Sequence, residues 1–72
     1  MVNYQIIRFL STWQVINKKT SETILEEPFP YNRSIVLENF FQKVSSCTTD
    51  QDVYDLWQLT KGEMEIEDEP NN

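Results

Sequence analysis

An apolar stripe within residues 32–44 (NRSIVLENFFQKV) constrains the fold of this 72-residue chain more than any other feature. Apolar side chains recur there at the spacing of one broad face of an α-helix: Val36, Leu37, Phe40, Phe41 and Val44. Polar residues occupy the opposite side, so the stripe predicts an amphipathic helix, which Asn32 or Ser34 can cap. A face that carries two phenylalanines must be covered, and the flanking segments have to supply the cover.

A second helix is predicted after Cys47. Thr48 or Thr49 can start it, and Gln51 or Asp52 three residues later completes a capping box or a near match. An apolar stripe follows at helical spacing: Val53, Leu56, Trp57 and Thr60. The pair at residues 61–62, Lys then Gly, is a typical stop signal, so we expect the helix to end there.

Three strands are predicted before the helices. Residues 3–10 are rich in β-branched and aromatic side chains and favour a strand with apolar groups on both faces. Residues 12–17 and 22–27 favour a hairpin around a four-residue turn, which Asn17 is suited to open. We therefore pair Asn17 with Glu22.

This pairing predicts which hairpin side chains face the helices. It places Val15 opposite Ile24, so that Trp13, Val15 and Ile24 share the face that covers the phenylalanine stripe. Ile16 and Leu25 then lie on the opposite face. They form a surplus apolar surface, which another part of the chain or another molecule would cover.

The C-terminal end differs from the rest of the chain in charge. Residues 1–62 carry seven acids and six bases, whereas residues 63–72 carry five acids and no base. We interpret residues 1–62 as the folded domain and residues 63–72 as an acidic tail. Within the tail, residues 63–67 alternate Met and Ile with glutamates, which favours a short strand or an extended peptide at a sheet edge. Residues 68–72 are predicted to be disordered.

The sequence as a whole predicts a small α+β domain. We expect an antiparallel sheet of about three strands with two helices packed on one face, in the order β-β-β-α-α, with a short C-terminal strand as an open alternative. The single Cys leaves no disulfide within the chain, and the absence of His removes the commonest metal ligand. Nine aromatic residues or a partner must therefore supply stability. A homodimer therefore stays open. No secretory signal or membrane span is visible, which indicates a cytoplasmic protein.

Composition argues against several classes of function. Without His, and with one Cys and one Gly, the chain cannot assemble a catalytic triad or a glycine-rich phosphate loop, so we do not expect an enzyme or a cofactor. Asp50, Asp52 and Asp55 do not have the spacing of a calcium loop, and we expect no metal site. The six basic residues are dispersed, which argues against direct binding of nucleic acid.

Three functions remain as hypotheses. The first is a protein–protein interaction module that regulates, inhibits or assists a larger partner. The second is an acidic mimic of nucleic acid that uses Asp50, Asp52, Asp55 and the tail, and the third is a minor structural subunit of an assembly. Candidate partner-binding residues are Ile16, Leu25, Tyr54, Trp57, Glu63, Met64, Glu65, Ile66 and Glu67. Helical spacing favours the core for Trp57.

Overall fold

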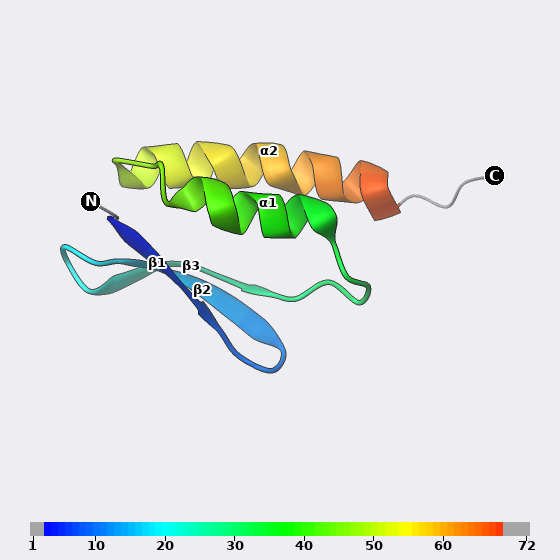
Figure 1. Cartoon of the computed structure of the whole chain (residues 1–72), viewed down its shortest axis with the longest axis horizontal. Coiled ribbons are helices and arrows are strands. Elements are labelled where there is room, and N and C mark those ends of the chain that lie inside the picture. Colours follow the sequence, from blue (N-terminus) through cyan, green and yellow to red (C-terminus); the bar gives the residue numbers. More distant parts are fainter. Residues whose placement is uncertain (1–2, 69–72) are drawn as a thin grey trace.

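The computed structural model describes residues 3–68 as a three-stranded antiparallel sheet followed by two helices (Figure 1). The strands lie in the order β1-β2-β3, with bounds Tyr4–Arg8, Thr12–Asn17 and Glu22–Pro28. The helices are α1, Ile35–Val44, and α2, Asp50–Asp68. Both helices lie on the same side of the sheet (Figure 1), so the predicted α+β arrangement is confirmed.

Asn17 builds the turn between β2 and β3. Its side-chain oxygen accepts hydrogen bonds from the backbone N–H groups of Lys19 and Thr20, and its backbone carbonyl accepts from the N–H of Ser21. Ser21 closes the turn at a φ of 63°, in the left-handed region. Asn17 pairs with Glu22, as predicted. Local hydrogen bonding by a single side chain therefore determines this turn.

A β-bulge at Ile24 changes the register of the hairpin beyond that first pair. Ile16 pairs with Thr23 but Val15 pairs with Leu25, so Ile24 has no partner across the ladder. The predicted pairing of Val15 with Ile24 is therefore wrong. One extra residue moves the following side chains to the other face of a strand. Leu25 consequently packs against the core instead of lying on the surplus face, and Ile24 packs there as well.

The sheet face away from the helices carries mainly polar side chains. The register places Gln14 and Glu26 opposite each other on this face, and the Gln14 amide donates a hydrogen bond of 2.7 Å to the Glu26 carboxylate. Ile16 lies on the same face, as predicted. Its apolar neighbour there is Ile7 of β1, and both are half-buried.

Side-chain caps start both helices. The Ser34 hydroxyl accepts a hydrogen bond of 3.0 Å from the backbone N–H of Leu37 at the start of α1. At the start of α2, the Thr49 hydroxyl accepts from the N–H of Asp52, and the Asp52 carboxylate accepts from the N–H groups of Thr48 and Thr49. The predicted N-cap and the predicted capping box are confirmed.

Helix α2 continues past Gly62. Residues 63–67 are helical, so both the expected stop at Gly62 and the alternative strand are wrong. Glycine inside a helix costs only about 1 kcal/mol relative to alanine, which packing can outweigh. Met64 follows Trp57 by two helical turns, extends the same buried stripe and packs against the core. The helix thus crosses the boundary expected between domain and tail.

The described part of the chain ends at Asp68, the last residue of α2. Asp68 is the last helical residue, so this part of the segment expected to be disordered is helical. Residues 69–72, which were also predicted to be disordered, lie outside the described residues. The side chains of Glu67 and Asp68 lie outside them as well.

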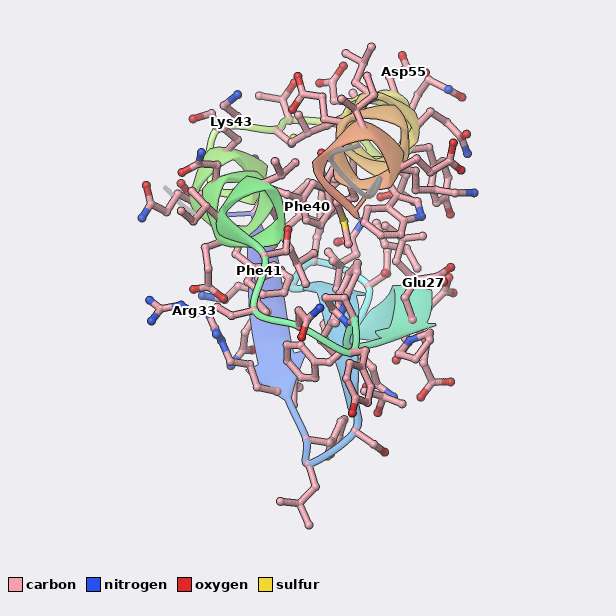
Figure 2. The ribbon with its side chains drawn as sticks, turned by 90° about the vertical axis from the view of Figure 1, so that its right-hand side faces the viewer. Glu27, Arg33, Phe40, Phe41, Lys43 and Asp55 are labelled. Carbon is pink, nitrogen blue, oxygen red and sulfur yellow. The ribbon has the colours of Figure 1, made fainter. Side chains whose placement is uncertain are left out.

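Trp13 of β2 lies at the centre of the core. Its side chain is fully buried. The distance between ring centroids is 5.5 Å from Trp13 to Phe40, 5.2 Å to Phe41 and 4.9 Å to Trp57. Figure 2 shows Phe40 and Phe41 extending from α1 into the space between the helices and the sheet. The Trp13 indole N–H has no hydrogen-bond partner among the described residues, so Trp13 stabilises the fold through buried area and ring contacts.

Candidate partner-binding groove

Two hydrogen bonds fix the start of α2 to the sheet. The Tyr4 hydroxyl donates to Oδ1 of Asp50 at 2.8 Å, and the Asn17 side-chain amide donates to the same oxygen at 2.9 Å. Burial of Tyr4, reinforced by the hydrogen bond to Asp50 and its negative charge, raises the pKa of the phenol to about 12. Asp50 is the first residue of α2, so these bonds set the position from which the helix crosses the sheet.

The other end of α2 borders a groove of about 280 Å³ that is open to solvent. It lies between residues 57–65 of the helix and residues 27–30, which form the end of β3 and the start of the following loop. Five apolar and three charged residues line it: Glu27, Pro28, Phe29, Pro30, Trp57, Lys61, Met64 and Glu65. In the view of Figure 2, Glu27 lies below α2 on the β3 side of the molecule.

The first wall of the groove is the Pro-Phe-Pro segment. Pro28 ends β3 and Pro30 follows two residues later, and neither has an N–H to continue the ladder. The backbone N–H of Phe29, between them, donates a hydrogen bond of 2.9 Å to the Ser11 carbonyl in the β1–β2 turn. The Phe29 ring contacts Phe41 edge-on at 6.4 Å, so this wall is attached to the core.

The second wall is one face of α2. Trp57, Lys61, Met64 and Glu65 follow one another at helical spacing, which brings them to the same side of the helix. Trp57 is only 6 % exposed and joins the wall to the core, whereas Met64 is half-buried. Met64 and Glu65 belong to this wall because the helix continues past Gly62.

Negative charge predominates on the groove. Glu27 and Glu65 contribute carboxylates, and Lys61 is the base among the lining residues. Neither carboxylate forms an ion pair with another residue that the structure describes. An ion pair is found elsewhere, between Arg8 of β1 and Glu38 of α1, with N–O distances of 3.2 and 3.3 Å. The groove carboxylates are therefore available to a partner.

The groove brings together three of the nine residues predicted to bind a partner: Trp57, Met64 and Glu65. Sequence reasoning missed its other lining residues, namely Glu27, Pro28, Phe29, Pro30 and Lys61. A signal for them was present, because an aromatic residue between two prolines is held in an extended segment that cannot bury itself in a sheet.

The other candidates are separate from the groove. Ile16 lies on the uncovered face of the sheet, and Leu25 packs against the core. Tyr54, Glu63 and Ile66 are exposed on α2 but do not line the groove. Glu67 lies near the end of α2, and its side chain is outside the described set.

No family model, curated protein sequence or solved structure matches this chain. Within residues 3–68, no three His, Cys, Asp or Glu side chains are grouped in a way that could hold a metal ion. Neither helix of that range combines the length and the apolar character needed to cross a membrane. The groove must therefore be interpreted from its own chemistry.

Proposed function

We propose that this protein is a non-enzymatic interaction module, a small regulator, inhibitor or accessory subunit that binds a larger protein through the groove between Phe29 and α2. The observation that carries the proposal is an open groove lined by the half-buried side chains of Phe29 and Met64 together with charged residues. Protein interfaces commonly combine an apolar centre with a polar rim, and aromatic residues are enriched among their energetic anchors.

The size of the groove supports a protein partner over a small molecule. Small-molecule sites usually enclose about 300–1,000 Å³ and bury most of the ligand. This groove, at about 280 Å³, is smaller and open to solvent. It has room for a side chain or two from a partner surface. A second molecule that inserts such a side chain can bury the surrounding surface as well.

Several apolar side chains outside the groove are exposed. Leu10 in the β1–β2 turn and Tyr31 in the β3–α1 loop are fully exposed, and Phe9 and Ile35 are more than half exposed. The hydrogen bond between Phe29 and Ser11 holds this turn and this loop together. Specific interfaces bury roughly 800 Å² on each partner, more than the groove alone can offer. We propose that a partner that reaches beyond the groove buries some of these exposed side chains as well.

The acidic-mimic hypothesis has weaker support. Asp50 is bound by Tyr4 and Asn17, and Asp52 caps its own helix. These carboxylates serve the fold, which leaves fewer charges for a surface that imitates phosphates. A minor structural subunit would use the same apolar surface, and it differs from the first hypothesis in the permanence of the complex.

The test is affinity purification from the native cell lysate with the whole chain, a groove variant and a matched control. Met64→Ser removes an apolar side chain from the groove, and Leu59→Ser removes one from an exposed position of α2 outside it. Both changes preserve charge. We expect the wild type and Leu59→Ser to retain a specific protein that Met64→Ser does not retain. Direct binding is then measured between the purified protein and this chain. Equal retention by both variants would place the interaction elsewhere and refute the proposal.

A further inference from the structure

We propose that the partner segment bound in the groove is positively charged, with one aliphatic or aromatic side chain seated between Phe29 and Met64 and with Lys or Arg side chains beside Glu27 and Glu65. This inference rests on the proposed function and adds the chemistry of the partner. Charge complementarity is the argument, and it has three parts.

The first part is the state of the groove carboxylates. Glu27 and Glu65 lie on opposite walls, and neither is paired with a described residue. A partner that covers the groove takes both carboxylates partly out of water, which is costly unless a cation compensates. An acidic partner would add repulsion to this cost. Lys61 does not reverse the preference, since a lysine can line a groove with its aliphatic stem while its ammonium group stays in water.

The second part is the charge of the helix end. A helix C-terminus carries roughly half a negative charge from its backbone dipoles, and basic residues usually compensate it. The last turn of α2 contains no base. In the sequence, five acids and no base occupy residues 63–69. The backbone dipole and the side chains therefore have the same sign at this end of the groove, and a cationic partner relieves their repulsion.

The third part is that the main alternative occupants fit the charge poorly. A second copy of this chain carries the same net charge of −6. A symmetric contact through this face would bring the same acidic groove of both copies together. Nucleic acid presents phosphates, which these carboxylates repel. A basic segment of a different protein fits the charge of the groove best.

The probe for the test is a phage-displayed library of random twelve-residue peptides, selected on the full chain. Parallel selections use Met64→Ser and the double variant Glu27→Gln with Glu65→Gln. We expect the wild type to enrich peptides that combine an apolar side chain with an excess of Lys and Arg, and Met64→Ser to lose them. The double variant should bind the enriched peptides about three- to tenfold more weakly at low salt, and this difference should shrink as salt rises.

The outcomes separate this inference from the proposed function. Neutral or acidic peptides that require Met64 would overturn the inference and leave the groove as a binding site. Basic peptides that bind the double variant as tightly as the wild type would also overturn it, because the two glutamates would then not be what selects them. The same peptides enriched by the wild type and by Met64→Ser, or no enrichment by either, would count against both the inference and the proposed function.

Discussion

The Tyr4 hydroxyl of β1 donates a hydrogen bond of 2.8 Å to Asp50, the residue that begins α2. The two residues are 46 positions apart in the sequence. This bond joins the first strand to the last helix. Because α2 also forms one wall of the groove at its far end, the contact near its start helps to orient the groove.

Tyr4→Phe should destabilise the fold by about 1–2 kcal/mol at neutral pH, since it removes a hydrogen bond to a carboxylate. Asn17 continues to donate to the same oxygen, which limits the loss. Urea denaturation at pH 7 measures the effect. An unchanged midpoint would mean that water replaces the phenol without cost.

The phenol of Tyr4 should also make the stability depend on alkaline pH. Its pKa is raised to about 12 in the folded chain, against an ordinary value of 10.0 for a tyrosine. The folded state therefore keeps a proton that the unfolded state releases. The contribution is fully present below pH 10 and is lost as the pH rises through about 12. Denaturation across this range should show a steeper loss for the wild type than for Tyr4→Phe, and equal slopes would contradict the assignment.

Phe40→Ala should cost about 3–5 kcal/mol, the usual range for truncation of a buried phenylalanine. Phe40 is 1 % exposed and its ring contacts Trp13 and Trp57, so the cavity would open at the centre of the core. A domain has typically about 5–15 kcal/mol of stability, so this substitution removes a large share of it. Asn39→Ala, at an exposed position of the same helix, is the control and should change stability by less than about 0.5 kcal/mol. Circular dichroism with urea distinguishes the two.

Gly62→Ala should stabilise the protein by about 0.5–1 kcal/mol. A Cβ at this position meets no atom within 4 Å, and the backbone is helical, so alanine adds helix propensity without strain. Amide hydrogen exchange at residues 63–66 should slow in the variant. Destabilisation would indicate a left-handed glycine that ends the helix, as the sequence had suggested.

Asp52 should make the stability sensitive to acid. Hydrogen bonds from the Thr48 side chain and backbone, and from Thr49, lower the pKa of its carboxyl group below its ordinary range. The contribution is present above the unfolded pKa of about 3.9 and is lost as the pH falls through the lower folded value. Asp52→Asn should flatten the stability profile below about pH 4. If both proteins show the same profile, the Asp52 cap does not contribute to the acid sensitivity of the fold.

The sequence by itself determined the features that depend on neighbours a few residues apart. The amphipathic stripe of α1, the Ser34 cap, the Thr49–Asp52 capping box and the turn opened by Asn17 are all local. In each case a side chain meets its partner within four positions, so spacing alone predicts the contact. The order of three strands and two helices followed from these local signals.

Tertiary structure decided the features in which weak local preferences compete with packing. The bulge at Ile24 turned Leu25 toward the core, because burying an additional apolar side chain can outweigh one interrupted pair of the ladder. The glycine signal at residue 62 yielded to the packing of Met64, since the preference is only about 1 kcal/mol. The groove joins Phe29 to residues of α2 that lie far along the chain. No local spacing encodes such a contact, so the groove could be recognised only once the strands and helices had been placed against one another.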